Sequence, residues 1–132
     1  MGKELRDSIL AAKDMPEPVK VPVPEWGKDV WIKVMSGTER DALDAENFQF
    51  VDKEVKINRE NGRARLLVRC LCDELGRRLF SDADAVLLGG KKHDVLDRLY
   101  DIAQKVNKLD AESIKDLSKN SEAGQSGSSI SA

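Results

Sequence analysis

The start of the chain shows two kinds of hydrophobic spacing, one helical and one extended. Apolar residues recur at helical intervals over residues 3–13, which predicts a short amphipathic helix. Branched aliphatic residues then alternate with other residues over residues 19–23 and again over residues 30–34, the period of two expected of half-buried strands. We therefore predict a β-hairpin at about residues 19–35, with its turn at residues 26–29.

Two prolines place the first predicted strand at the edge of its sheet. Pro22 and Pro24 lie two residues apart, so their missing N–H groups would face the same side of the strand. That side can have no hydrogen-bonding partner, which makes the strand an edge. Proline at an edge also discourages unintended strand addition.

After the hairpin the pattern becomes helical. Thr38 can cap a helix with acidic residues in its first turn, and we expect this helix to reach about Phe50. The polar stretch of residues 52–61 is interpreted as a loop that ends at the Asn61-Gly62 turn. Its only apolar anchors are Val55 and Ile57.

A core helix is predicted next, with Gly76 as its stop. The apolar residues that keep to one face of this helix are Ala64, Leu67, Val68, Leu71 and Leu75. Arg63, Arg65 and Arg69 fall on the opposite side. We interpret these arginines as a solvated helix face rather than an RNA contact, because no aromatic residues are interleaved with them.

Three more helices are predicted towards the C-terminus. Ser81 can cap a short helix over residues 85–88, and the steadiest apolar stripe in the chain predicts a longer one over residues 95–109. Asp110 can cap a last helix that reaches Leu117. Beyond it the chain consists largely of Ser, Gly, Glu and Gln, which cannot bury enough apolar area to offset the entropy of ordering.

Together these elements predict an α+β fold that is mainly α. The β-hairpin at about residues 19–35 would pack on a small helical bundle, within a single domain of residues 1–117. Residues 118–132 would form a flexible, disordered tail rich in Ser and Gly.

Composition narrows the possible partners. The chain has 132 residues, 35% of them charged, with a formal net charge of -2, so there is no global basic field to attract nucleic acid. No apolar run approaches the roughly 20 residues that span a bilayer. We therefore expect neither a nucleic acid nor a membrane partner, and a protein that stays in the cytoplasm where it is made.

The residue types used in catalysis and metal binding are sparse. Cys70 and Cys72 are one residue apart, and the only histidine, His93, lies about 20 residues further on, which leaves a zinc site short of a ligand. The Gly89-Gly90 pair lacks the remaining residues of a phosphate-binding loop. We expect reduced thiols on a helix, a surface histidine at a helix start, no metal, no cofactor and no catalytic residue.

Large side chains are the remaining candidates for a partner-binding surface. They are Trp26, Trp31, Leu79, Phe80 and Tyr100. Aromatic residues make up only 5% of the chain, so each of the five could equally serve the core.

The order of several short motifs resembles one protein family. The motifs are Leu5-Arg6-Asp7-Ser8-Ile9-Leu10-Ala11-Ala12, Val21-Pro22-Val23-Pro24-Glu25-Trp26-Gly27, Val34-Met35-Ser36-Gly37-Thr38-Glu39-Arg40-Asp41, Ala64-Arg65-Leu66-Leu67-Val68-Arg69, Cys72-Asp73-Glu74, Arg78-Leu79-Phe80-Ser81-Asp82-Ala83-Asp84 and Val95-Leu96-Asp97-Arg98-Leu99-Tyr100-Asp101-Ile102-Ala103-Gln104. This set, from about Leu5 to Asn120, resembles the tail assembly chaperones of long-tailed, lambda-like phages and prophages. One departure is at residues 73–77, where the family has an acidic-Gly-Asn turn and Leu75 and Arg77 favour a helix extension.

The resemblance implies a mainly helical protein that binds the tape measure protein, keeps it soluble and recruits the major tail protein during tail assembly. It further implies self-association into a spiral homo-oligomer, absence from the mature virion, and a longer product made by ribosomal frameshift, for which the Ser/Gly tail would be a linker. Two alternatives remain open. They are a structural head-tail connector or minor tail protein of the virion, and a small nucleic-acid-binding regulator.

Overall fold

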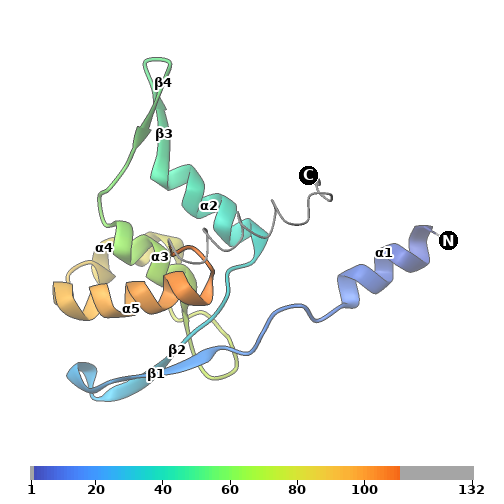
Figure 1. The fold of residues 1–132 in the computed structure, drawn as a ribbon, viewed down its shortest axis with the longest axis horizontal. Coiled ribbons are helices and arrows are strands. Elements are labelled where there is room, and N and C mark those ends of the chain that lie inside the picture. Colours follow the sequence, from blue (N-terminus) through green and yellow to red (C-terminus); the bar gives the residue numbers. More distant parts are fainter. Residues whose placement is uncertain (1, 111–132) are drawn as a thin grey trace, which may run out of the picture.

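The N-terminal helix stands apart from the rest of the protein. The structure is a computed structural model that describes residues 2–110. Helix α1 (Gly2–Ala11) confirms the predicted amphipathic helix, and all ten of its residues are exposed. An extended segment, residues 12–18, joins it to the body (Figure 1).

The predicted hairpin forms and gains a third strand from a distant part of the chain. Strand β1 (Val19–Val23) pairs antiparallel with β2 (Lys28–Ile32), and β2 pairs on its other side with β5 (Leu71–Cys72). The turn lies two residues earlier than the predicted residues 26–29, since Lys28 and Asp29 already belong to β2. It contains the single-turn 3₁₀ helix η1 (Pro24–Trp26) and Gly27, whose φ of 68° suits glycine. In the order β1-β2-β5, β1 is an edge strand, as predicted.

Only one of the two prolines lies in that edge strand. Pro22 is within β1, opposite Asp29, but Pro24 begins η1. The prediction that both prolines lie in the strand is therefore wrong for Pro24. Its fixed φ and missing N–H instead suit the first position of a helical turn.

Helix α2 (Gly37–Asn47) begins earlier and ends earlier than predicted. Its cap is Ser36 rather than Thr38. The Oγ of Ser36 accepts from the N–H of Glu39 at 3.2 Å, and the Glu39 carboxylate accepts from the N–H of Ser36 at 2.9 Å. The helix stops three residues short of Phe50, because the chain turns to extended geometry at Phe48.

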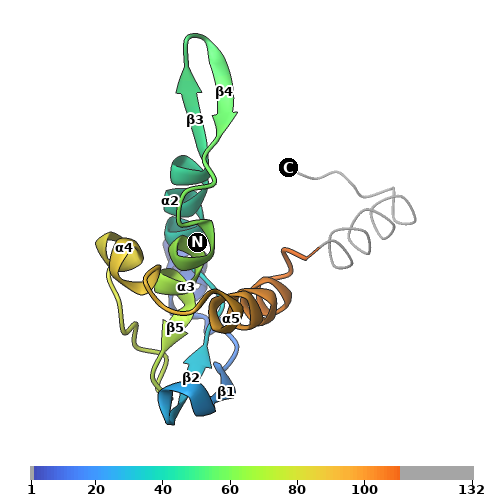
Figure 2. The same ribbon diagram turned by 90° about the vertical axis from the view of Figure 1, so that its left-hand side faces the viewer.

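The stretch interpreted as a loop is a β-hairpin. Strand β3 (Phe48–Val51) pairs antiparallel with β4 (Glu54–Ile57), and the pair projects from the end of α2 away from the body (Figures 1 and 2). Asp52 and Lys53 connect the strands with φ of 51° and 66°, the left-handed pair of a type I′ turn. We call residues 48–57 the arm.

Helix α3 (Gly62–Cys70) ends six residues before Gly76, so the predicted core helix is too long. Leu71 and Cys72 continue as β5 instead, and the carboxylate of Asp73 accepts from the N–H groups of Leu75 and Arg77, each at 2.9 Å. This turn places Gly76 at a φ of 85° and leaves Leu75 exposed. Residues 73–77 therefore form a turn rather than a helix extension.

The later helices match the prediction more closely. The chain forms η2 (Asp82–Asp84), α4 (Ala85–Leu88) and α5 (His93–Val106). Ser81 is the cap of η2 and not of α4, where Asp84 holds that position, so the predicted cap is wrong for residues 85–88. The N–H of Ser81 donates to the carboxylate of Asp84 at 2.8 Å. His93 is exposed at the start of α5, as predicted. The predicted helix from Asp110 to Leu117 and the predicted flexible tail lie outside the described residues.

The core lies between the three-stranded sheet and helices α3, α4 and α5. It combines the inward side chains of β1 and β2 with the buried apolar residues of α3 and the buried stripe of α5. The α+β fold class, mainly helical with a small antiparallel hairpin packed on the helices, is confirmed.

Candidate partner-binding surface

One face of the arm is entirely apolar, and each of its four side chains is more than half exposed. The β3–β4 register sets Phe48 opposite Ile57 and Phe50 opposite Val55, and directly opposed residues share a face of a hairpin. Their exposed fractions are 52% for Phe48, 60% for Ile57, 74% for Phe50 and 65% for Val55. We call these four residues the arm face.

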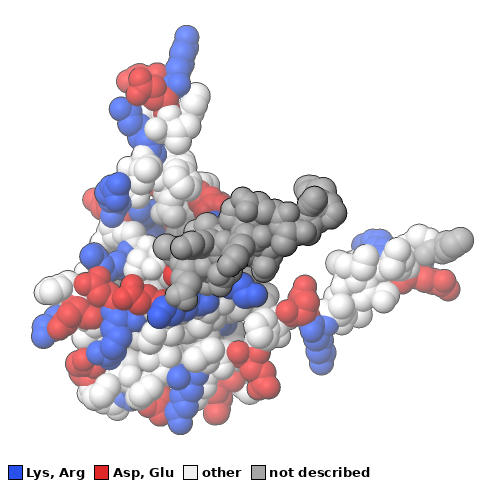
Figure 3. Space-filling model, in the orientation of Figure 1, with Lys and Arg blue, Asp and Glu red and all other residues white. Residues whose placement is uncertain are grey.

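The opposite face of the arm is mainly polar. It carries Gln49, Val51, Glu54 and Lys56, with Asp52 and Lys53 at the turn. The charged groups gather at the tip, where Figure 3 shows red and blue above uncharged surface. An isolated two-stranded hairpin is marginally stable in water. An arm with this exposed apolar face therefore has the properties of a surface that is covered by a partner.

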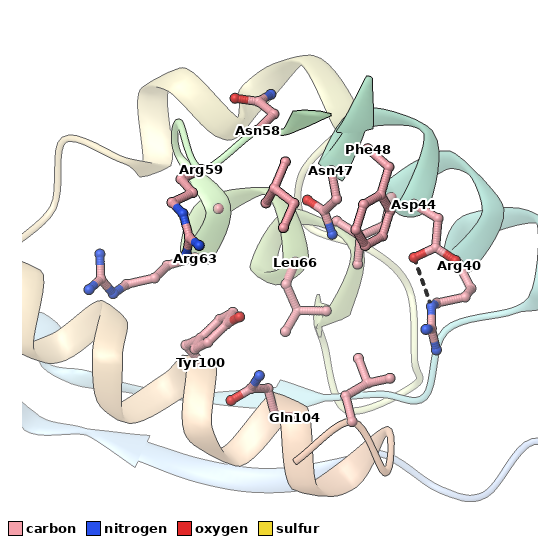
Figure 4. A pocket seen from close by; sticks show the side chains of 14 residues that line it. Arg40, Asp44, Asn47, Phe48, Asn58, Arg59, Arg63, Leu66, Tyr100 and Gln104 are labelled. Carbon is pink, nitrogen blue, oxygen red and sulfur yellow. Dashed lines mark hydrogen bonds and ion pairs between the residues drawn. The ribbon is translucent and has the colours of Figure 1, made fainter. Parts of the chain in front are cut away.

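A hollow of about 600 Å³ opens at the base of the arm, between α2, α3 and α5 (Figure 4). Leu66 and Tyr100 point into it from α3 and α5, and Leu109 lines it from beyond α5. The polar groups around it include Arg40, which pairs with Asp44 at 3.2 Å, and Arg63, which pairs with Asp97. The hollow thus combines an apolar lining with charged groups.

The hollow and the arm face form one continuous surface. Phe48 and Ile57 line the hollow and also belong to the arm face, and Phe50 and Val55 extend it along the arm. We call the arm face together with the hollow's Leu66, Tyr100 and Leu109 the apolar strip. Contiguous exposed apolar surface of this kind is often associated with function.

Arg65 fixes the base of the arm to the body. Its guanidinium donates to the side-chain oxygen of Asn47 at 2.6 Å, to the carbonyl of Asn58 at 2.7 Å and to the carbonyl of Glu60 at 2.9 Å. Asn47 directly precedes β3 and Asn58 directly follows β4, so one side chain holds both ends of the arm. Arg65 is 6% exposed, which makes this a buried and well-oriented anchor.

Arg69, one turn along α3, joins that helix to α2 and η2. It is fully buried, and its guanidinium donates to the carboxylate of Glu46 at 2.9 Å and to the carbonyl of Arg65 at 2.8 Å. It also pairs with Asp82 at 3.1 Å. The predicted solvated arginine face is therefore wrong for Arg65 and Arg69 and holds only for Arg63, because neighbouring elements cover that side of α3.

A sequence model of the phage tail assembly chaperone family matches residues 4–120. The chain belongs to this family. Among solved structures, the tail assembly chaperone of bacteriophage HK97 has a similar fold, with a TM-score of 0.57 over 80% of this chain and 95% of that one, at 20% identity. No curated protein sequence matches the chain significantly.

The five residues predicted for a partner surface do not form one patch in this chaperone. Tyr100 alone among them lines the hollow. Trp26 and Phe80 are half-buried and, like Tyr100, pack against the core. Trp31 is half-buried on β2 and Leu79 is 51% exposed. Whether these residues contact a partner stays a prediction.

The arm face was missed because its residues were divided between a helix end and a loop. The signal for it is the alternation of Phe48 and Phe50 before Asp52-Lys53, and of Val55 and Ile57 after it. Such alternation on both sides of a two-residue connection predicts a hairpin. Asp-Lys is a less common type I′ turn sequence than Asn-Gly or Asp-Gly, so the turn residues alone did not indicate a hairpin.

The thiols are in environments that disfavour ionisation. Burial raises the pKa of the Cys70 thiol to about 12 and also raises the pKa of the Cys72 thiol. Cys70 ends α3 and Cys72 lies in β5, so the prediction that both are on a helix is wrong for Cys72.

Within residues 2–110, no cluster of His, Cys, Asp or Glu could hold a metal ion. The same residues include no helix long and apolar enough to cross a membrane.

Proposed function

We propose that this tail assembly chaperone binds apolar helical segments of the tape measure protein on its apolar strip. The observation that supports the proposal most strongly is the exposure of the whole arm face beside an apolar hollow. A helix laid along the strip could place side chains at positions i, i+3, i+4 and i+7 against Phe50, Phe48 and the hollow. This is the helix-in-groove mode of recognition.

The groups around the strip are suited to a reversible complex. Arg59, Arg63 and Gln104 line the hollow beside its apolar residues, and the arm ends in charged groups. Such an apolar centre with a polar rim is the usual anatomy of a protein interface. A bound apolar helix would thus lose its contact with water while the outer surface of the complex stays charged.

The remaining parts of the proposed function rest on the resemblance to tail assembly chaperones. The chaperone keeps that protein soluble in the host bacterial cytoplasm, recruits the major tail protein around it, and is absent from the mature virion. It self-associates into a spiral homo-oligomer while it works, and a longer form made by ribosomal frameshift carries a C-terminal extension joined through the Ser/Gly tail. It acts by binding alone, without catalysis, cofactor, metal, nucleic acid or membrane.

Co-expression tests the proposal directly. The wild-type chain should raise the soluble fraction of the tape measure protein encoded with it and co-purify with it. Phe50→Thr/Val55→Thr should lose both effects, because threonine keeps strand propensity while removing most of the apolar area. The matched control is Val51→Thr, on the opposite face of the same strand and 43% exposed. Equal behaviour of the two variants would contradict the proposal.

The two alternatives make different predictions. A structural head-tail connector or minor tail protein would be found in purified virions at a fixed copy number, whereas the chaperone is expected only in lysates before assembly is complete. A nucleic-acid-binding regulator would give a salt-dependent gel shift. We expect no shift, since the formal net charge is -2.

A further inference from the structure

A second, smaller hollow lies beside the larger one and is lined by basic side chains. It has a volume of about 160 Å³ and lies between the first turns of α3 and α5, the residues just before α3 and the connection from α4 to α5. The nitrogen-bearing side chains that line it include Arg59, Arg63, Lys91 and His93. None of the described residues that line it is acidic. We call it the basic hollow.

Two of its cationic groups have no acidic partner. The guanidinium of Arg63 is paired with Asp97. Within residues 2–110, neither Arg59 nor Lys91 forms an ion pair, and both residues are exposed. Like charges brought together around one hollow repel each other, and an anion placed between them removes that repulsion. The basic hollow therefore has the electrostatics of a site for a negatively charged group.

The other groups around the basic hollow favour the same kind of ligand. Its floor includes Ala64 and Leu96, which are buried, and low-dielectric walls strengthen the attraction between opposite charges. Asn61 does not cap α3 with its side chain, so its amide can donate to a ligand. A Cβ on Gly89 would lie 2.5 Å from the side-chain oxygen of Asn61, so glycine at position 89 makes room for this amide.

The basic hollow is continuous with the larger hollow of the apolar strip. Arg59, Gly62 and Arg63 line both hollows. Figure 4 shows Arg59 and Arg63 at the opposite end of the larger hollow from Arg40. A segment that lies along the apolar strip would therefore bring a residue that flanks its apolar part to the basic hollow.

We infer that the basic hollow binds the carboxylate of an Asp or Glu that flanks the apolar part of the bound tape measure segment. The inference deepens the proposed function and rests on it. The planar guanidinium of Arg59 can donate two parallel hydrogen bonds to one carboxylate, and Lys91 adds a compact charge. Because this charge lies at one end of the larger hollow, the contact would fix the direction in which the segment lies.

A protein carboxylate is favoured over the phosphates of a nucleic acid. The formal net charge of the chain is -2, so there is no extended basic surface for a polyanion. With a volume of about 160 Å³, the basic hollow has room for a single charged group. Its neighbour is an apolar surface, which suits the rest of an amphipathic protein segment.

Two synthetic peptides test the inference by fluorescence anisotropy. Both carry the same apolar helical sequence from the tape measure protein, with Glu at both flanking positions in one and Gln in the other. The wild type should bind the Glu peptide about fivefold more tightly, the order expected of two partly exposed ion pairs. The preference should shrink as salt rises from about 0.05 M to about 0.5 M. Arg59→Gln/Lys91→Gln should bind both peptides equally.

The matched control is Lys3→Gln/Lys13→Gln, which removes two exposed charges at α1, away from the basic hollow. It should keep the preference for the Glu peptide. Equal binding of the two peptides by the wild type, or a preference that survives in Arg59→Gln/Lys91→Gln, would overturn the inference while leaving the proposed function standing. If neither peptide bound, the proposed function would fail and the inference with it.

An oligonucleotide serves as the competing ligand. A labelled single-stranded oligonucleotide should show no binding to the wild type under the same conditions. Binding that is lost in Arg59→Gln/Lys91→Gln would assign the basic hollow to nucleic acid and overturn the inference.

Discussion

The guanidinium of Arg65 donates a 2.6 Å hydrogen bond to the side-chain oxygen of Asn47, the last residue of α2. The same guanidinium holds the carbonyl of Asn58, on the far side of the arm. Asn58 in turn donates its N–H to the carbonyl of Asn47 at 2.7 Å. The arm is therefore mounted on a closed set of hydrogen bonds and not on a flexible connection, although its own surface is exposed.

Arg65→Lys should loosen the arm without unfolding the protein. A lysine ammonium is a point charge that cannot reproduce the planar fork reaching Asn47, Asn58 and Glu60 together. Amide hydrogen exchange across residues 48–57 should become at least about tenfold faster, the equivalent of roughly 1.4 kcal/mol in local opening. Arg63→Lys, at a half-exposed position two residues earlier, serves as the control and should leave exchange unchanged.

Arg69 should matter for stability more through packing and pairing than through charge alone. Arg69→Ala leaves a cavity and separates Glu46 and Asp82 from their buried partner, so the free energy of unfolding should fall by about 3–5 kcal/mol. Arg69→Met fills most of the volume and should cost less than about 2 kcal/mol. Urea unfolding followed by circular dichroism measures both losses, and equal losses would contradict this account.

The ion pair between Glu25 and Arg98 should make stability depend on pH in a defined range. Two hydrogen bonds of 2.8 Å join η1 to α5, and the bond from Arg98 lowers the pKa of Glu25 from 4.5 to about 2. A carboxyl whose folded pKa is depressed stabilises the fold above its unfolded pKa and loses that contribution as pH falls through the folded value. The loss should therefore occur between pH 4.5 and about 2.

Thermal unfolding of Glu25→Gln measures this contribution. The difference in Tm between wild type and variant should be constant above pH 4.5 and should shrink towards pH 2. The variant Arg98→Gln should show the same shrinking difference, and the double variant should add nothing further. A difference that persists unchanged to pH 2 would contradict the predicted role of the pair.

The thiols should be unreactive in the folded protein. Burial raises the pKa of Cys70 to about 12, so almost no reactive thiolate exists at neutral pH. Ellman's reagent should modify neither Cys70 nor Cys72 within minutes, and both should react at once in denaturant. Rapid modification of the native chain would show that α3 and β5 open far more often than their burial implies.

Elements with a strong hydrophobic periodicity were predicted well. The errors in element boundaries arose where contacts with distant parts of the chain favoured another structure. The stripe along α5 and the alternation in β1 and β2 leave one geometry favoured, so these elements agree with the structure. Leu71 fitted the helical face of α3 equally well but pairs with Ile32 in the sheet. The spacing of hydrophobic residues within one segment does not indicate pairing with a strand that is distant in the sequence.

The burial of Arg65 and Arg69 could not be predicted from the hydrophobic pattern of α3 either. Arg65 and Arg69 fall on the polar side of α3, where charged residues normally meet solvent. They are buried because the base of the arm and η2 cover that side and supply the acceptors. Of the five residues predicted for a partner surface, Tyr100 lines the hollow beside the arm. The arm face was not predicted, because its four residues are exposed and do not belong to a core pattern.

Binding of a purified tape measure segment tests the central claim most directly. Isothermal titration of a predicted apolar helix of that protein into the wild type, Phe50→Thr/Val55→Thr and the Val51→Thr control should give three dissociation constants. We predict that the arm-face variant binds at least about a hundredfold more weakly, roughly 2.7 kcal/mol, because the centre of the interface is lost. The Val51→Thr control should remain within about twofold of wild type, a difference of roughly 0.4 kcal/mol. Equal affinity of all three proteins, or no binding by the wild type, would contradict the account.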